Sequence, residues 1–183
     1  MILHNGKEYA RVSDILRPFS DYSHIDPNVL QAKCDIGTKV HQAIADLIKG
    51  DFPCPGQKGV GYFESYERWN NIIRPKVICS EERYFNEEKM ITGQIDALML
   101  LPGDDVPVLV DFKTSANEAE TWIKQAHLYG YLVEKTGKAI SPRYVFLKLN
   151  KYGLAPTVFQ YRFCKNILRK CLNAIDMFWN NKK

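Results

Sequence analysis

The chain has 183 residues, with 25 Lys and Arg against 21 Asp and Glu and a net charge of +4. Hydrophobic residues make up 45% of it, which predicts a globular fold with room for a core, and we expect residues 1–183 to form one domain. Because no apolar run is long enough to cross a bilayer and no basic leader precedes an apolar segment, we expect neither a membrane anchor nor a signal peptide.

The N-terminal third favours a hairpin followed by helices. Asn5-Gly6 between short apolar segments is typical of a tight hairpin turn. The segment 12–16 is expected to be the end of a strand entering a short helix capped by Ser13. Asp26-Pro27 is a strong helix start, and apolar residues with helical spacing predict an amphipathic helix over 35–49, stopped by Gly50.

The remainder alternates between strand-like and helix-like segments. A loop over 50–59 precedes a helix that ends before Pro75. Strands are then expected at 76–85, 90–101 and 106–113, a helix at 118–135, a hairpin of 143–149 and 154–161, and a last helix at 165–179. This order predicts a mixed α/β fold in which one central mixed sheet is flanked by helices.

Two acidic residues fall on the neighbouring strands 90–101 and 106–113. A Pro-Gly-Asp-Asp turn at 102–105 separates these strands. If the turn centres on Gly103-Asp104, the numbers of opposed residues sum to 207, so Asp96 faces Asp111 with Cβ atoms roughly 5 Å apart.

The setting of these carboxylates favours a cation. Along 108–113, Val108, Val110 and Phe112 share one face, and Leu109, Asp111 and Lys113 share the other. Carboxylates side by side in apolar surroundings repel each other and lose hydration, and a divalent ion such as Mg²⁺ or Mn²⁺ removes both penalties. Lys113 can then reach a water or phosphate beside the metal. The alternative is a simple Asp–Lys ion pair on an exposed face.

Six motifs in order resemble the PD-(D/E)XK nuclease superfamily, in its RecB-type and phage exonuclease branch. The matching segments are Val12-Ser13-Asp14-Ile15-Leu16, Gly37-Thr38-Lys39-Val40-His41, Ser80-Glu81-Glu82-Arg83-Tyr84-Phe85, Gly93-Gln94-Ile95-Asp96, Asp111-Phe112-Lys113-Thr114-Ser115 and Gln125-x-x-x-Tyr129. Each motif is weak by itself, and their common order is the specific feature.

The resemblance implies a metal-dependent deoxyribonuclease with a restriction-endonuclease-like core. The implied ligands of one or two Mg²⁺ or Mn²⁺ ions are Asp96, Asp111, the Phe112 backbone carbonyl, Glu81 and His41. Lys113 would position the attacking water and stabilise developing charge in an in-line attack on a DNA phosphodiester. Gln125, Tyr129, Thr114 and Ser115 would brace the site or contact DNA.

Several assignments have structural alternatives. His41 lies at the edge of an apolar helical stripe, where a lone histidine is more often a core residue. Glu81 and Glu82 point to opposite faces, so only one can serve, and the motif spacing favours Glu81. Gln125 and Tyr129 are one helical turn apart, so a purely structural hydrogen bond is about equally compatible.

The resemblance also implies a biological setting. We expect an exonuclease that processes linear DNA ends in recombination or repair, in the cytoplasm of a bacterium or a phage-infected cell. A single-strand annealing or binding protein would be its partner, and a homo-oligomer is compatible. Alternatives are a structure-specific endonuclease and a catalytically inactive nuclease-like DNA-binding or assembly protein; cleavage polarity and strand preference stay open.

The cysteines and the charge are consistent with this setting. Five scattered cysteines (Cys34, Cys54, Cys79, Cys164 and Cys171) argue against a disulfide framework, and we expect mostly buried free thiols. One subgroup of the branch holds an iron–sulfur cluster with four cysteines, three of them near the C-terminus. Only Cys164 and Cys171 lie there in this chain, so no cluster is expected. The basic charge suits a nucleic-acid partner without demonstrating one.

Overall fold

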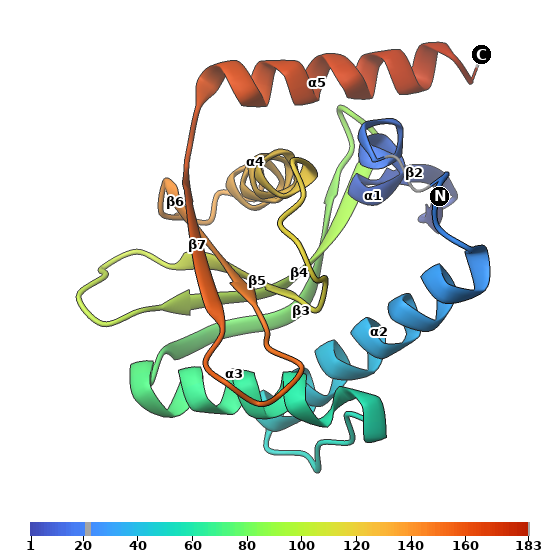
Figure 1. Ribbon diagram of the computed structural model, residues 1–183. Coiled ribbons are helices and arrows are strands. Elements are labelled where there is room, and N and C mark those ends of the chain that lie inside the picture. The colour runs from blue at the N-terminus through green and yellow to red at the C-terminus, as the bar shows by residue number, and fades with distance from the viewer. Residues whose placement is uncertain (21–22, 183) are drawn as a thin grey trace.

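The computed structural model describes residues 1–20 and 23–182, and its described strands form one seven-stranded mixed sheet with helices on both faces (Figure 1). The strands are β1 (Ile2–His4), β2 (Lys7–Arg11), β3 (Lys76–Asn86), β4 (Ile91–Leu100), β5 (Val108–Lys113), β6 (Arg143–Lys148) and β7 (Thr157–Arg162). The α-helices are α1 (Val12–Leu16), α2 (Pro27–Lys49), α3 (Val60–Ile73), α4 (Thr121–Glu134) and α5 (Lys165–Asn180), with short 3₁₀ helices η1 (Arg17–Phe19) and η2 (Gln57–Gly59).

The N-terminal hairpin has the predicted turn, but the predicted helix cap is wrong. Asn5 and Gly6 have φ angles of 49° and 73°, as a tight hairpin of this kind requires. Helix α1 follows β2 directly, so Ser13 lies inside the helix and Arg11 is its first flanking residue. The Asp14 carboxylate accepts a hydrogen bond from the Arg11 N–H at 3.1 Å. The start of the helix is therefore stabilised by an acidic side chain from its first turn, because that carboxylate satisfies a free backbone donor.

Helix α2 is longer than the apolar spacing predicted and carries His41 to the sheet. Its start at Asp26-Pro27 is confirmed: the Asp26 carboxylate accepts hydrogen bonds from Asn28 N at 2.7 Å and Val29 N at 3.3 Å. Gly50, with φ of 82°, ends the helix as predicted. The helix predicted over 35–49 therefore begins earlier, at Pro27. Its cap at Asp26 precedes the segment whose apolar spacing gave the prediction.

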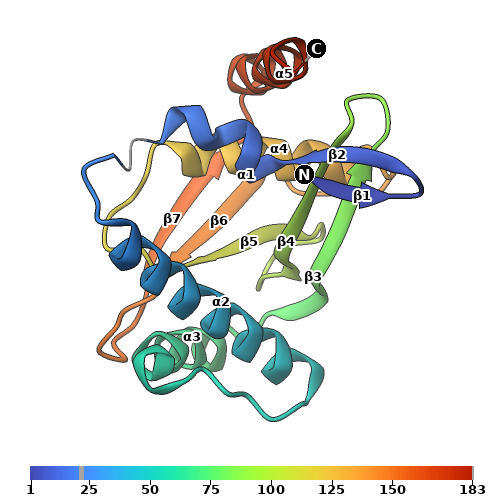
Figure 2. The same cartoon turned by 90° about the vertical axis from the view of Figure 1, so that its right-hand side faces the viewer.

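The sheet separates two apolar cores. Helices α2 and α3 cover one face, and α1 and α4 cover the other, with α5 packed against α1 and α4 (Figure 2). Val108, Val110 and Phe112 belong to the core beneath α2 and α3, whereas Leu109 belongs to the core beneath α4. The predicted alternation along this strand is therefore confirmed, and β5 is covered on both sides.

One edge of strand β4 is shared by two partner strands. Along this edge β4 pairs with β2 at residues 91–92 and with β5 at residues 97–99, and we call the gap between these partners the fork. Along its opposite edge β4 pairs with β3. The three β4–β5 pairs run from Ala97↔Val110 to Met99↔Val108, which confirms the predicted sum of 207. The ladder stops there, so Asp96 and Asp111 lie just beyond the last pair instead of forming one.

The cysteines differ from the expectation of burial. All five are free, but only Cys171 is buried; Cys79 and Cys164 are half-buried, and Cys34 and Cys54 are exposed. The prediction of mostly buried thiols is wrong, because Cys34 lies on an exposed part of α2 and Cys54 lies in the following loop. No helix in the described ranges 1–20 and 23–182 has the length and apolarity needed to cross a membrane.

A glycine in α3 allows the β6–β7 loop to approach this helix. A Cβ atom at Gly61 would lie 2.0 Å from the Lys151 backbone oxygen.

Gly61→Ala gains helix propensity, but the added methyl group clashes with backbone that cannot rotate away. We expect a loss of about 1–3 kcal/mol in unfolding free energy, measured by urea denaturation. Arg68→Ala, an exposed position on the same helix, should stay within about 0.5 kcal/mol of wild type; equal stability of both variants would contradict this packing.

Candidate active site

The Asp96 carboxylate lies at the fork between β4 and β5. Its Oδ2 accepts a hydrogen bond from the Phe112 backbone N–H at 2.6 Å, replacing the backbone acceptor that a continued ladder would supply. Its Oδ1 lies 3.2 Å from His41 Nδ1. Asp96 is only 9% exposed and Asp111 only 1%. The fork therefore brings two buried acidic residues together with the middle of α2.

Three side chains have the spacing of a metal site. One ligand atom each of His41, Glu81 and Asp96 lies within 4.8 Å of the others. A cavity of about 460 Å³ is lined by His41 and Glu81, together with Gln94 and four α2 residues, Cys34, Gly37, Thr38 and Gln42. Imidazole nitrogen and carboxylate oxygen are ligands that Mn²⁺ accepts, and the carboxylates suit Mg²⁺. The sequence-predicted residues His41, Glu81 and Asp96 are thus brought together at a solvent-accessible cavity.

The structure separates Glu81 from Glu82. The register between β3 and β4 places Glu81 opposite Asp96, since Glu82 pairs with Ile95. The Glu82 carboxylate instead accepts hydrogen bonds from Tyr84 at 2.6 Å and from Lys138 at 2.8 Å. Of the two alternatives that the sequence left open, only Glu81 lies in the cluster.

Charges inside the site shift the acidities of its members. Burial disfavours a charged imidazole, but the Asp96 carboxylate outweighs this and raises the pKa of His41 to about 9. Burial also opposes ionisation of Asp96, yet the His41 charge and hydrogen bond lower the pKa of Asp96 below its usual value. Burial raises the pKa of Asp111, which Lys113 offsets only in part. Burial and the Asp96 charge also raise the pKa of Glu81.

Lys113 is held between β5 and α4. Its Nζ lies 2.5 Å from Asp111 Oδ2 and donates a hydrogen bond to Gln125 Oε1 at 2.9 Å. The Gln125 amide in turn donates to the Tyr129 hydroxyl at 3.0 Å. Gln125 and Tyr129 therefore form a chain of hydrogen bonds that fixes the ammonium group beside Asp111.

The remaining predicted residues lie at the edge of this arrangement. Thr114 is half-buried and faces α2, where a Cβ atom at Gly37 would come within 3.1 Å of its Oγ1. Ser115 is exposed, and its hydroxyl donates to the Asn117 carbonyl at 3.1 Å. The Phe112 backbone contacts the site through its N–H, and a metal-binding role of its carbonyl stays a prediction.

A divalent cation fits the donors that are present. Within the described part of the chain, the two Asp111 carboxylate oxygens are buried and accept no hydrogen bond of good geometry, although the Lys113 ammonium forms an ion pair with Oδ2 at 2.5 Å. Buried carboxylate oxygens normally accept hydrogen bonds, because an unpaired one loses hydration without compensation. Asp111 is not part of the three-residue cluster, but the Asp96 charge acts on it. The Oδ1 oxygen, which lacks even this ion pair, is an acceptor that a bound cation would satisfy.

Comparisons with known proteins agree with the observed fold. No protein-family model matches the chain, and no curated protein does. The structure of a proposed exonuclease from Eubacterium rectale is similar with a TM-score of 0.55 and 13% sequence identity, over 99% of this chain and 85% of that one. The alkaline exonuclease LHK-Exo from Laribacter hongkongensis has a TM-score of 0.47 and 9% identity, covering 94% and 87%. Its complex with dAMP gives the same TM-score and coverage at 10% identity.

At 13% sequence identity, the similarity to the Eubacterium rectale structure shows a shared fold. It confirms the predicted mixed α/β architecture, a central mixed sheet flanked by helices. It extends over nearly the whole chain, so the helices on both faces of the sheet are included.

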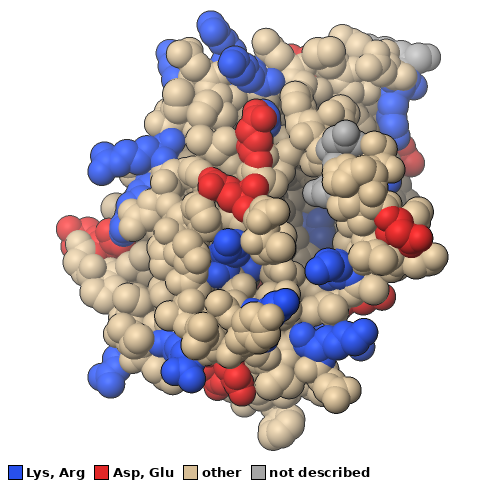
Figure 3. Space-filling view, in the orientation of Figure 1, with Lys and Arg blue, Asp and Glu red and all other residues tan. Residues whose placement is uncertain are grey.

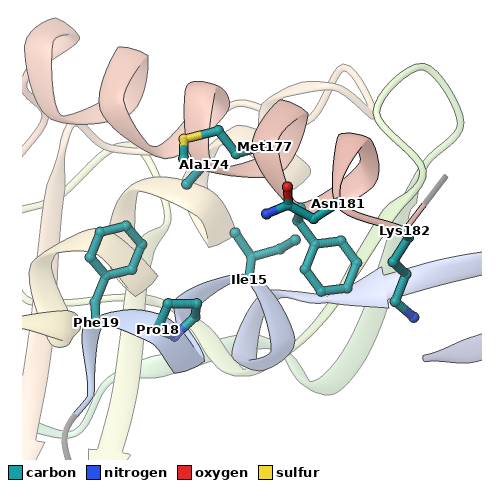
Figure 4. A pocket seen from close by; sticks show the side chains of 8 residues that line it. Ile15, Pro18, Phe19, Ala174, Met177, Asn181 and Lys182 are labelled. Carbon is teal, nitrogen blue, oxygen red and sulfur yellow. The ribbon is translucent and has the colours of Figure 1, made fainter.

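A second cavity lies away from the carboxylates, between α1–η1 and α5 (Figure 4). It has a volume of about 310 Å³, and its lining is mostly apolar: Ile15, Pro18, Phe19, Ala174, Met177 and Phe178, with Asn181 and Lys182 at one end. None of these lining residues is acidic or a histidine. The cavity lined by His41 and Glu81 is therefore the better candidate for a metal site.

Ionisation of the buried Asp111 carboxylate should destabilise the metal-free protein, because Lys113 offsets the cost of burial only in part. Because burial raises the pKa of Asp111, its ionisation lowers folding stability as pH rises above the unfolded-state value of about 4. In EDTA at pH 8, Asp111→Asn should raise the unfolding free energy by about 1–3 kcal/mol and remove any Mn²⁺-induced rise in Tm. Thermal unfolding at pH 5 and pH 8 measures both effects, with a smaller gain at pH 5.

A matched surface variant separates this effect from a general change of charge. Asp176 forms an exposed ion pair with Lys89, and Asp176→Asn should change stability by no more than about 0.5 kcal/mol. A lower Tm for Asp111→Asn than for wild type in EDTA at pH 8 would show that the Asp111 carboxylate is satisfied in the folded protein.

Proposed function

We propose that residues 1–183 form a PD-(D/E)XK nuclease domain that hydrolyses DNA phosphodiester bonds with Mg²⁺ or Mn²⁺. The observation that carries the proposal is the pair of buried carboxylates at the fork, Asp96 and Asp111, with the Lys113 ammonium 2.5 Å from Asp111. Carboxylates and one lysine suit phosphoryl transfer, which needs positioning and charge stabilisation more than a protein nucleophile.

The metal would be held by residues that the fold already gathers. Asp96, Glu81 and His41 would be direct or water-mediated ligands, and Asp111 would contribute a buried carboxylate oxygen. When bound, a divalent ion neutralises phosphate charge and assists departure of the 3′-oxygen.

The protein groups would orient the reactants. Lys113, fixed by Gln125, would donate a hydrogen bond to the attacking water or to a phosphate oxygen and stabilise the charge that develops there. Gln125 and Tyr129 would act by bracing Lys113, and Thr114 and Ser115 would lie beside the DNA backbone. Such prearranged donors are effective because they need not reorganise during the reaction.

The charge distribution supports DNA as the substrate. The net charge is +4, and Lys and Arg side chains gather around a hollow near the middle of the face in Figure 3. Cationic side chains around a concave site attract phosphate and raise the rate of association. The similarity in fold to a proposed exonuclease also supports this substrate.

We further propose that the enzyme is an exonuclease that acts on DNA ends in recombination or repair. A phage or bacterial setting and a single-strand annealing or binding protein as partner belong to this proposal. The supporting observations are the order of the motifs in the sequence and the fold shared with a proposed exonuclease.

The central test is DNA degradation with and without metal. Wild-type protein should degrade labelled linear DNA with Mg²⁺ or Mn²⁺ and stop in EDTA. Asp111→Ala and Lys113→Ala should each lower the rate by about a hundredfold to a thousandfold, because each removes a group that stabilises charge in the transition state. Asp176→Ala, on the surface of α5, is the matched acidic control and should retain full activity.

The same assay distinguishes the alternatives. Covalently closed circular DNA should survive under conditions that degrade the linear form; cleavage of the circle would indicate an endonuclease instead. Specific Mn²⁺ and DNA binding without cleavage would indicate an inactive binding protein. Undiminished cutting by either site variant would refute the assignment of roles.

A further inference from the structure

A second hydrogen-bonded chain reaches the cavity from the β3–β4 pair, and the motifs gave it no role. Arg83 and Gln94 are cross-strand partners on β3 and β4. The Gln94 Nε2 amide donates to Glu81 Oε2 at 2.6 Å, and Arg83 Nη2 donates to Gln94 Oε1 at 2.5 Å. Gln94 and Glu81 both line the cavity that His41 also lines, so this chain ends beside the candidate metal cluster.

This chain fixes the direction of the Gln94 amide. A glutamine side chain has one accepting oxygen and one donating nitrogen, whereas arginine can only donate. The oxygen of Gln94 must therefore face Arg83, which turns its NH₂ group toward Glu81. A reversed amide would set two donors against each other and leave the Glu81 oxygen without this bond.

Glu81 needs such support because its backbone is unusual. Its φ angle is 53°, in the left-handed region that residues with a Cβ seldom adopt. The β3–β4 ladder has pairs at Ser80 and at Glu82 but none at Glu81. This conformation turns a half-buried carboxylate toward His41 and Asp96, and the Gln94 amide is its hydrogen-bond donor there.

We propose that Gln94, anchored by Arg83, is a positioning residue that holds the Glu81 carboxylate in place to bind the divalent metal. The inference rests on the proposed function in one respect, namely that Glu81 is a metal ligand. Gln94 itself would touch neither metal nor DNA. Groups that orient a ligand in this way typically contribute 10- to 100-fold in metal affinity.

The test is Mn²⁺ binding to the full chain without DNA, measured by calorimetry and by the electron paramagnetic resonance signal of free Mn²⁺. Gln94→Met keeps the length of the side chain but removes both hydrogen bonds, and it should weaken the Mn²⁺ Kd about 10- to 100-fold. Arg83→Met should weaken it less, because Gln94 can still reach Glu81. In the nuclease assay, saturating Mn²⁺ should restore most of kcat in Gln94→Met. The Mn²⁺ concentration that gives half-maximal activity should stay higher than in wild type.

A double-mutant cycle tests whether Gln94 acts through Glu81. In the background of Glu81→Ala, adding Gln94→Met should change the Mn²⁺ Kd less than twofold, because the carboxylate that Gln94 holds is already absent. Additive effects of the two changes would show that Gln94 acts independently, and the inference would be overturned.

A matched glutamine control separates positioning from general damage. Gln31 on α2 makes a similar side-chain hydrogen bond, to Asp35 at 2.7 Å, on an exposed surface. Gln31→Met should leave Mn²⁺ affinity unchanged, and the Tm of metal-free Gln94→Met should fall by only a few degrees.

The outcomes distinguish this inference from the proposed function. Wild-type Mn²⁺ affinity in Gln94→Met would overturn the role of Gln94 and leave the nuclease proposal intact. If wild-type protein bound no Mn²⁺, both would fail.

Discussion

The candidate site depends on a hydrogen bond between the Asp96 carboxylate and the Phe112 backbone N–H. Where the β4–β5 ladder ends, a backbone donor is left without a carbonyl partner in a buried position. Such a donor must be satisfied, and a side-chain oxygen does this here. The carboxylate is therefore held at the fork, with its second oxygen directed to His41. One bond thus ends the ladder and orients an acidic group toward the cavity.

Two glutamine side chains hold charged groups of the site in the same way. Gln125, held by Tyr129, fixes the Lys113 ammonium, and Gln94, held by Arg83, fixes the Glu81 carboxylate. In both cases an amide accepts at one end and donates at the other, so that its orientation is determined. Helix α4 thus supports the Lys113 ammonium, and the β3–β4 pair supports the Glu81 carboxylate. Rigid elements can hold such groups more closely than mobile loops can.

Burying charged groups at this site lowers the stability of the folded protein. Asp111 is buried, and burial raises its pKa although Lys113 forms an ion pair with it, whereas the neighbouring His41 charge lowers the pKa of Asp96. Perturbed pairs of this kind are concentrated at functional sites, because chemistry needs groups that folding alone would not favour. The surrounding apolar cores supply the stability that this arrangement loses.

The sequence by itself determined the mixed α/β fold, the turn at Asn5-Gly6, the helix start at Asp26-Pro27, the helix stop at Gly50 and the β4–β5 register, because these follow from local conformation and side-chain periodicity. It also singled out Asp96 and Asp111 through that register. Only the tertiary structure decided that the ladder ends before this pair, that Glu81 and not Glu82 joins His41, and that Gln94 supports it. These features depend on the left-handed backbone at Glu81 and on contacts between distant segments, which neither periodicity nor propensity encodes.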